Sequence, residues 1–386
     1  MTQGPGRIAA LDMLRGYALV CIMLDHMPIG VLRRFTLTNY AIFDAAELFV
    51  LLSGFLVGMV WIKVQARQGL AAAQWRFLRR AGQVWLALIA GGVLLALLSR
   101  VLREAGLVHT AVWFEYGNWV IDNPLGYLGT LGLLWMQPNL LDVLALYVIL
   151  LALAPVTVPL LLRWPWRFAA GSLALWAVAI PLNAALPNQR VEGGLLFNPF
   201  GWQLLFHAGV AMGAFRHRFM PVLRRHARLL TVLAAVVMLY GTLLGWTARW
   251  GHAVPPLQPL RDALWGLSGP VDKWRLDAVR VVAIVAASWL VAVPLAGVLG
   301  RLAATRLGRA LAVIGRGGLV SFVACVLLSV VGDAMAMTPP GAGWPRLLAV
   351  DLWVMAALWL VADSWLRLQA GRTQAGRTQA GRTQAR

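Results

Sequence analysis

The sequence predicts an all-α, polytopic integral membrane protein with about ten transmembrane helices in one bundle. Of the 386 residues, 60% are hydrophobic and only 13% are charged. The mean hydropathy of +0.72 is well above that of ordinary soluble domains. Apolar runs long enough to cross a bilayer as helices recur along the chain, and Lys and Arg gather in the short segments between them.

The apolar runs mark the predicted spans, of which one, at 200–215, is short enough to be tilted or partly re-entrant. The ten runs cover residues 8–30, 41–62, 81–99, 140–162, 168–186, 200–215, 229–247, 279–300, 317–337 and 345–366. No linker divides them, so residues 1–366 are predicted to form one membrane domain. The remaining residues 367–386 contain the repeat AGRTQ, and we predict a disordered basic tail.

The formal charge of +19 would suggest nucleic acid in a soluble protein, but here it follows the membrane topology. Segments on the side of the N-terminus hold roughly twice as many Lys and Arg residues as those on the other side, which is the positive-inside pattern. We therefore predict a multi-pass protein in contact with the lipid bilayer, with both termini cytoplasmic and no nucleic-acid partner.

The first predicted span carries four ionisable residues, which are costly in a bilayer and usually functional: Asp12, Arg15, Asp25 and His26. His26 follows Arg15 by eleven positions, which places both on one helix face about 16 Å apart. A carboxylate beside a histidine is typical of a general base, although a histidine near a helix end is more often structural. Arg15 either pairs with Asp12 or holds an anionic ligand.

The second predicted span opens with Asp44 and Glu47, and Gly54 and Gly58 follow on the same face as Glu47. Such a glycine face either lets a neighbouring helix approach closely or leaves room for a narrow ligand. Because a short outer loop joins the first two spans, we expect the acid and histidine that end the first span to meet the two acids that open the second.

The 19 tryptophans are many for a chain of this length. They are interpreted either as an interfacial aromatic belt or, in the outer segments 103–137 and 246–275, as flat platforms for sugar rings beside charged groups. Trp119 lies in the first of these segments.

The motifs of several other chemistries are missing from the sequence. The six histidines are dispersed and form no close pair with another His or Cys, so we predict no metal site. Walker and GxSxG motifs are also missing, which leaves nucleotide hydrolysis and classical serine chemistry without a basis.

The ordered motifs along the chain resemble a known family. The residues around Arg7, Leu14-Arg15-Gly16, Asp25-His26 and Leu52-Ser53-Gly54-Phe55 resemble membrane acyltransferases of the acyltransferase 3 type. Three later stretches are similar to the OpgC family, the osmoregulated periplasmic glucan succinyltransferases: Gln137 to Pro155, Phe197 to Gly213, and Ile314 to Phe322.

This resemblance implies acyl transfer across the bacterial inner membrane. Cytoplasmic acyl-CoA, as succinyl-CoA in the name-giving members, would be the co-substrate, and a hydroxyl of a periplasmic glucan would be the acceptor, with no permanently bound cofactor. His26 would be the base or a transient acyl carrier, Asp25 its partner, and Glu47 a third catalytic residue on the acceptor side. The implied donor-binding residues are Asp12, Arg15, Ser53 and Gly54. The implied acceptor-binding residues are Asp44, Trp119, Asn198, Trp202 and Gln203.

Two alternatives from other classes stay open. In a transporter or exporter of glucan or another polar substrate, intramembrane Asp, His and Arg residues would line the pathway, although no inverted repeat is evident. A membrane scaffold for glucan synthesis would carry no chemistry. Label moving from acyl-CoA to glucan would select the enzyme.

Overall fold

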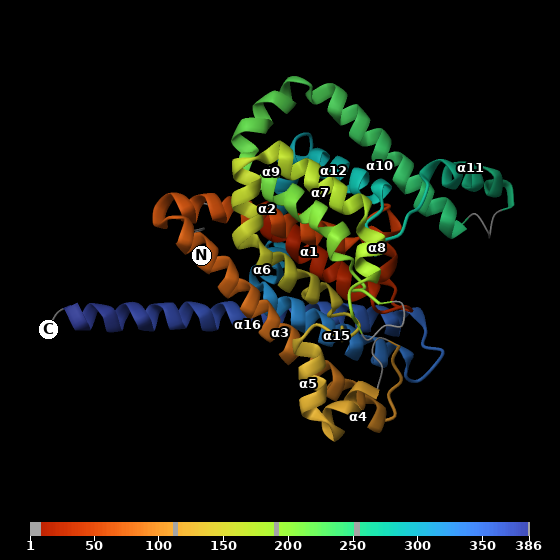
Figure 1. The fold of residues 1–386 in the computed structure, drawn as a ribbon. Coiled ribbons are helices and arrows are strands. Elements are labelled where there is room, and N and C mark those ends of the chain that lie inside the picture. The colour runs from red at the N-terminus through yellow and green to blue at the C-terminus, as the bar shows by residue number, and fades with distance from the viewer. Residues whose placement is uncertain (1–8, 111–114, 189–192, 251–254, 385–386) are drawn as a thin grey trace. The chain divides into compact units, whose positions relative to one another are not determined.

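The computed structural model describes residues 9–110, 115–188, 193–250 and 255–384, and these residues form helices and no strands. By their contacts the residues group into two compact units. The terminal unit comprises Met1–Arg33, Leu107–His109 and Gly297–Arg386, and the central unit comprises Arg34–Gly106 and Thr110–Ala296. Figure 1 labels helices of both units, among them α1 (Ala9–Asp25), α15 (Leu319–Met337) and α16 (Trp344–Gln384) of the terminal unit and α2 (Ala45–Gln68) and α9 (Pro199–Arg225) of the central unit.

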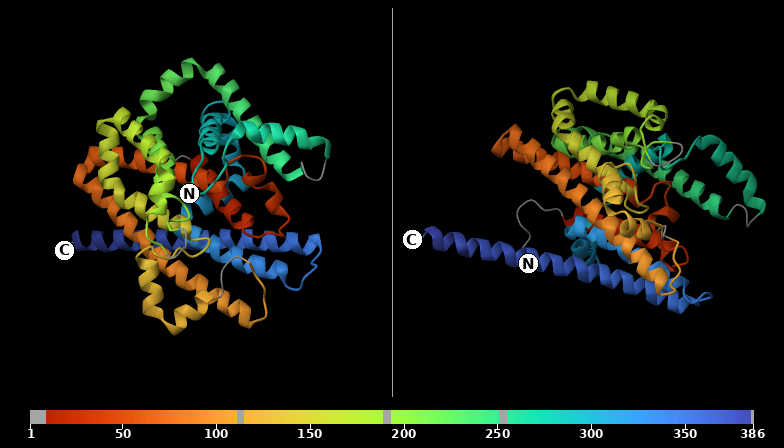
Figure 2. Two further views of the ribbon diagram at one scale, coloured as in Figure 1. Left: turned by 45° about the vertical axis from the view of Figure 1, so that its right-hand side comes forward. Right: turned by 60° about the horizontal axis from the view of Figure 1, so that its bottom comes forward.

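The terminal unit joins the first helix of the chain to the last ones. Its helices are α1 (Ala9–Asp25), α13 (Ala296–Ala304, whose first residue belongs to the central unit), α14 (Arg306–Gly317), α15 (Leu319–Met337) and α16 (Trp344–Gln384). Helix α1 packs on α14 and α15, and α15 and α16 lie side by side in both views of Figure 2.

The central unit is built around α2 and α9, which pack against each other along their length. Its helices are α2 (Ala45–Gln68), α3 (Leu70–Glu104), α4 (Glu115–Asp122), α5 (Pro124–Gly132), α6 (Asp142–Arg163), α7 (Pro165–Ala177), α8 (Ala179–Ala184), α9 (Pro199–Arg225), α10 (Ala227–Trp250), α11 (Gln258–Ser268) and α12 (Ala278–Ala292). Short 3-10 helices occur at Leu32–Phe35, Leu37–Asn39 and Pro255–Leu257.

The predicted all-α membrane fold class is confirmed, whereas the predicted count of about ten spans is not. Six helices among the described residues are long and apolar enough to cross a bilayer, or seven if α12 and α13 form one bent span. The six are Ala45–Gln68, Leu70–Glu104, Asp142–Arg163, Ala227–Thr247, Leu319–Met337 and Trp344–Arg372. The other predicted runs still lie largely on helices. However, α1 has only 17 residues, and the run at 168–186 breaks between α7 and α8.

The domain boundary predicted at residue 366 lies within a continuous helix. Helix α16 runs to Gln384 and therefore extends into the polar repeats for which the sequence predicts disorder. The division into one membrane domain and a separate tail stays a prediction.

Glycines bring the backbones of two helix pairs into direct contact. A Cβ on Gly16 of α1 would lie 1.8 Å from the carbonyl oxygen of Leu311, and one on Gly315 of α14 would lie 1.9 Å from that of Asp12. In the central unit a Cβ on Gly54 would lie 2.1 Å from the carbonyl oxygen of Phe206. The glycine face of the second predicted span therefore serves helix packing, as small residues do in membranes.

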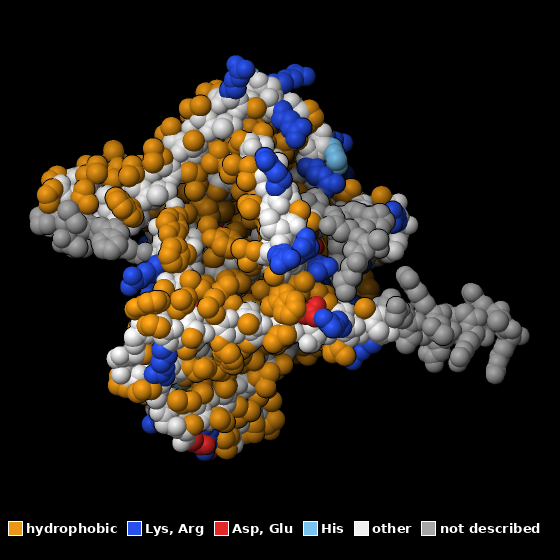
Figure 3. Space-filling model, turned by 180° about the vertical axis from the view of Figure 1, so that it is seen from behind, with side chains coloured by type: hydrophobic (Ala, Val, Ile, Leu, Met, Phe, Trp, Pro, Cys, Tyr) orange, Lys and Arg blue, Asp and Glu red, His pale blue; other side chains and the backbone are white. Residues whose placement is uncertain are grey.

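Apolar side chains cover much of the surface that Figure 3 shows. Large examples are Leu125, 82% exposed, and Trp166, 79% exposed. Exposed apolar groups of this size and number are unfavourable in water and are expected on a surface that faces lipid.

Candidate active site

His26 follows the last residue of α1 in the terminal unit and is half-buried, as is Asp25. Its Nδ1 lies 2.6 Å from the carbonyl oxygen of Ile22, one helical turn earlier. Because a carbonyl oxygen only accepts hydrogen bonds, Nδ1 carries the proton and Nε2 is the basic nitrogen of the neutral ring. This hydrogen bond therefore fixes the tautomer of the ring, and the role of His26 as a base stays a prediction.

The turn after His26 is held by Asp351, a fully buried residue of α16. Its Oδ2 accepts the backbone N–H of Leu32 at 2.7 Å. A Cβ on Gly30 would lie 2.8 Å from its Oδ1, so the turn approaches this carboxylate closely. Asp351 thus positions the segment that follows the histidine.

Sequence reasoning missed Asp351 and also Asp333, a fully buried residue of α15. Both lie within predicted spans, where a carboxylate is expensive and usually functional. That signal, applied beyond the first two spans, could have found both residues.

Asp12 and Arg15 lie on α1 at the level where this helix meets α14, and both are half-buried. The Asp12 carbonyl is the group that approaches Gly315, and Gly16 follows Arg15 directly. The spacing of the first-span motif is therefore also a packing requirement of α1 on α14. The roles of Asp12 and Arg15 toward a donor stay predictions.

Asp44 and Glu47 form a capping box at the start of α2 in the central unit. The Asp44 side chain accepts the backbone N–H of Ala46 at 2.8 Å, and Glu47 Oε2 accepts that of Asp44 at 3.1 Å. These bonds satisfy donors that the first turn of a helix leaves without partners. The two acids predicted from the sequence are thus neighbours.

Two cations complete a buried ion-pair network around these acids. Lys273 comes from the segment before α12, and Arg280 lies within α12. Lys273 Nζ lies 2.7 Å from Asp44 Oδ2. Arg280 contacts Glu47 Oε1 through both Nε and Nη2 at 2.5 Å and lies 3.7 Å from Asp44. Both oxygens of the fully buried Glu47 carboxylate are engaged, so this residue ties α2 to α12.

Electrostatics keeps the outer part of this network charged. Burial alone would raise the pKa of Asp44, but Lys273, the hydrogen bonding with Glu47, and Arg280 hold that pKa well below its usual range. Burial would lower the pKa of Lys273, yet Asp44 and Glu47 raise it above its ordinary value. Asp44 and Lys273 therefore remain an ion pair at neutral pH.

An aromatic wall stands beside Lys273. Its Nζ lies 5.1 Å from the ring centroid of Trp274 and 5.7 Å from that of Phe197. The backbone N–H of Asn198 and the indole N–H of Trp202 both donate to the carbonyl oxygen of Trp274 at 3.1 Å. Segment 272–277 thus brings three predicted acceptor-binding residues, Asp44, Asn198 and Trp202, into one cluster.

The remaining predicted site residues lie elsewhere in the central unit. Trp119 packs edge-on against Tyr127, with 5.5 Å between ring centroids, among α4 and α5. Gln203 forms hydrogen bonds with Ser172 of α7 and lies on a different face of α9 from Trp202, which bonds to Trp274. Ser53 is half-buried on α2, next to the glycine that packs on α9.

The expected meeting of Asp25 and His26 with Asp44 and Glu47 stays a prediction, since the two pairs belong to different compact units. Arg280 is an addition from the structure. Lys273 and Trp274 belong to the outer segment 246–275, for which the sequence left open an aromatic belt or a platform for sugar rings. Among the described residues, no group of three or more His, Cys, Asp or Glu could hold a metal ion.

Comparison with known families gives one match. A family model described as OpgC protein matches residues 7–369. This range includes all the motifs that indicated the family and every site residue named above. No curated protein and no solved structure matches the chain. The wider relation to the acyltransferase 3 type stays a prediction.

Proposed function

We propose that this chain, which belongs to the OpgC protein family, is a transmembrane O-acyltransferase. It transfers an acyl group, succinyl by the family resemblance, from cytoplasmic acyl-CoA to a hydroxyl of a periplasmic glucan. Family membership and the apolar helices support a membrane transferase. The charge pattern supports an inner-membrane location with both termini in the cytoplasm.

His26 is the proposed base. Its Nε2 removes the proton from the attacking hydroxyl while the new C–O bond forms at the thioester carbon. The C–S bond then breaks, and the imidazolium returns the proton to the departing CoA sulfur. The hydrogen bond from Nδ1 to the Ile22 carbonyl is the observation that carries this role, because it leaves Nε2 as the basic atom. Asp25 stabilises the imidazolium.

The acceptor side of the proposal uses the central unit. Asp44 and Lys273 provide charged groups. Trp274, which is 37% exposed, provides a ring face on which a sugar can pack, and the buried Phe197 supports that ring from behind. Because both oxygens of Glu47 are engaged, its proposed contribution is to position α2. Asp12, Arg15 and Ser53 remain the proposed donor contacts, whereas the face of Gly54 is filled by the backbone of α9.

The test is transfer of label from succinyl-CoA to glucan in membranes that contain His26→Ala. We expect the rate to fall by about 10²–10⁴-fold, the usual contribution of a general base. His226→Ala, which changes an exposed histidine at the end of α9, is the matched control and should retain transfer. A wild-type rate for His26→Ala would refute the proposal.

The second candidate is a transporter or exporter of glucan. Fully buried carboxylates in two spanning helices, Asp333 and Asp351, favour it, because such groups often line transport pathways. Sealed vesicles separate the two functions. Glucan that gains label supports the transferase, whereas unmodified glucan that crosses the membrane supports transport.

A further inference from the structure

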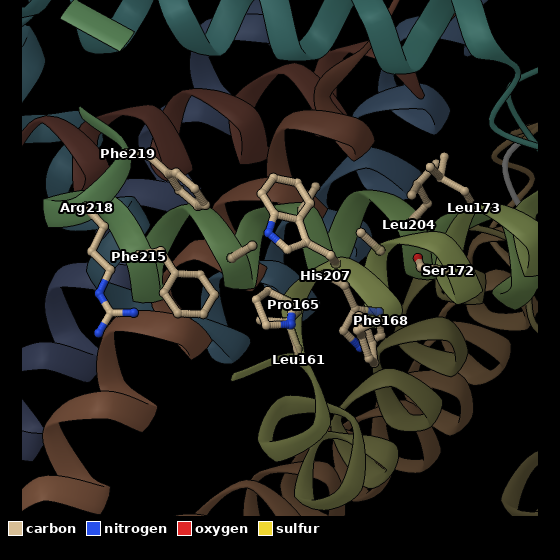
Figure 4. Close-up of a pocket in the computed structure, with 14 residues that line it drawn as sticks. Leu161, Pro165, Phe168, Ser172, Leu173, Leu204, His207, Phe215, Arg218 and Phe219 are labelled. Atoms are coloured by element: carbon tan, nitrogen blue, oxygen red, sulfur yellow. The ribbon is translucent and has the colours of Figure 1, made fainter. Parts of the chain in front are cut away.

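The central unit contains an apolar cavity of about 410 Å³ between α7 and α9. Figure 4 shows Arg218 and Phe215 at one end, Ser172 at the other, and His207 between them. Three of the lining residues are polar, namely Ser172, His207 and Arg218, and the remainder are apolar, including the exposed Trp166. The lining residues of α9, from Leu204 to Phe219, follow one face of this helix.

His207 supplies a hydrogen-bond acceptor inside this cavity that has no donor. Its Nδ1 lies 2.9 Å from the carbonyl oxygen of Gln203, so Nδ1 carries the proton. The side chain of Gln203 is itself fixed by two bonds to Ser172. His207 is only 6% exposed, and its Nε2 is buried without a partner. A buried acceptor of this kind calls for a ligand with an N–H or O–H group.

Arg218 supplies a positive charge at the exposed end of the cavity. Arg216, Arg224 and Arg225 lie on the same end of α9, and the sequence has no Asp or Glu between Glu192 and Asp262. This end therefore favours an anion. Arg218 follows His207 by eleven positions, which corresponds to about 16 Å along the helix axis.

The ligand must therefore carry an N–H or O–H donor some way along a slender chain from an anionic group. A phospholipid does not meet this requirement, because its polar groups lie close to the phosphate and its chains beyond the esters are hydrocarbon. A phospholipid chain in this cavity would leave His207 Nε2 without a donor. The phosphopantetheine arm of coenzyme A has the required pattern, with phosphate at one end, amide N–H groups along the chain and sulfur at the other end.

We propose that this cavity binds the phosphopantetheine arm of the acyl donor. The phosphates lie at Arg218, and an amide N–H of the arm donates to His207 Nε2. The proposal rests on the proposed function for its choice of donor. It adds a donor site in the central unit to the contacts predicted on the first two spans.

Truncated donors test the assignment. Arg218→Gln should raise KM for succinyl-CoA about tenfold, as expected for a lost charged hydrogen bond, with little change in kcat. With succinyl-pantetheine, which has no phosphate, the same variant should show the wild-type KM. An equal change in KM with both donors, or no change with either, would overturn the inference.

A matched pair on α7 tests the cavity itself. Ala169 lines the cavity, whereas Ala170 is the next residue and does not, and both are exposed. Ala169→Phe should raise KM at least tenfold for both donors, because the larger side chain fills the space that the arm needs, and Ala170→Phe should not. Equal KM values for the two variants would contradict the proposal.

Binding separates this inference from the proposed function. Calorimetric titration with coenzyme A should show binding to the wild type and weaker binding to Arg218→Gln. If that pattern appears but no donor supports transfer, the inference stands and the transferase proposal fails. If transfer occurs but the effect of Arg218→Gln follows the anionic lipid content of the membrane rather than the phosphates of the donor, the cavity binds lipid and the inference fails.

Discussion

His26 in the terminal unit and His207 in the central unit share one local hydrogen bond but lie in different surroundings. In each ring Nδ1 bonds to the carbonyl oxygen four residues earlier, Ile22 or Gln203, which places the proton on Nδ1. His26 lies half-buried at a helix end beside Asp25. His207 lies buried within α9, edge-on to Phe168 at 4.9 Å.

This comparison shows that the same helical hydrogen bond fixes the tautomer in both rings, while the surroundings of the two rings differ. At a half-buried helix end a protonated ring can stay hydrated, so a histidine there can take up a proton. Among apolar side chains the charged ring is disfavoured, and the histidine can act only as a neutral acceptor. This contrast supports the proposals of base chemistry for His26 and of ligand binding for His207.

The largest expected effect comes from exchanging each histidine for asparagine. His26→Asn should lower kcat by about 10²–10⁴-fold with little change in KM, because a proton acceptor is lost. His207→Asn should instead raise KM and leave kcat near the wild-type value. Steady-state kinetics with labelled succinyl-CoA measures both. If kcat falls in His207→Asn but not in His26→Asn, the proposed roles of the two histidines are wrong.

The buried network of the central unit should give the next largest effect. Arg280→Met leaves Glu47 buried without its cation, which typically costs about 3–5 kcal/mol of stability. Thermal unfolding in detergent would show the loss as a lower Tm. The double variant Arg280→Met with Glu47→Gln should recover part of it, because the unpaired charge is gone. If the double variant is no more stable than Arg280→Met alone, the unpaired charge of Glu47 is not the cause of the lost stability.

A smaller effect is expected at Asp351, which positions the turn after His26. Asp351→Leu removes the acceptor for the Leu32 N–H and should cost about 1–3 kcal/mol, with a lower kcat at every pH. Asp351→Asn keeps an acceptor oxygen and should restore most of the rate. A shift in the pH profile of kcat for Asp351→Asn would instead mean that the carboxylate charge acts on the reaction.

The smallest effect is the pH dependence of the pair formed by Asp44 and Lys273. Since the pKa of Asp44 is lowered by folding, its contribution is present above the ordinary value of 3.8 and is lost as the pH falls through the folded value. Since the pKa of Lys273 is raised, its contribution is present below the ordinary value of 10.5 and is lost as the pH rises through the folded value.

The difference in Tm between the wild type and Lys273→Met should therefore stay constant from about pH 5 to pH 9. Measurements of Tm across this range provide the test. A difference that changes steadily near neutral pH would contradict a cluster of fixed charge, because one of the two groups, or another acid that Lys273 interacts with, such as Glu47, would then titrate there.

Several parts of the candidate site could be predicted because they depend on neighbours along the chain. The spacing of Asp44 and Glu47 indicates a shared helix start, and the structure has a capping box there. The spacing of Gly54 and Gly58 indicates a close helix contact, and α9 provides it. In both cases the relevant geometry repeats within one or two helical turns.

Other parts could not be predicted, because each depends on a partner far along the chain. Arg280 meets Glu47 from a position 233 residues later, and Asp351 meets Leu32 from 319 residues later. No periodicity links such residues. Trp119 and Gln203 were predicted to lie with Asp44, Trp119 from the composition of its outer segment and Gln203 from its motif. In the structure Trp119 packs on Tyr127 and Gln203 bonds to Ser172, so neither joins the cluster around Asp44.

The sequence alone determined that this is a helical membrane protein of the OpgC protein family, because hydropathy, charge pattern and motif order are properties of the chain itself. Tertiary structure decided which cations pair with the buried acids, which glycines admit a neighbouring backbone, and that His207 lines a cavity. These features require helices distant in sequence to pack together, and the apolar surface that drives packing does not specify which polar groups will meet.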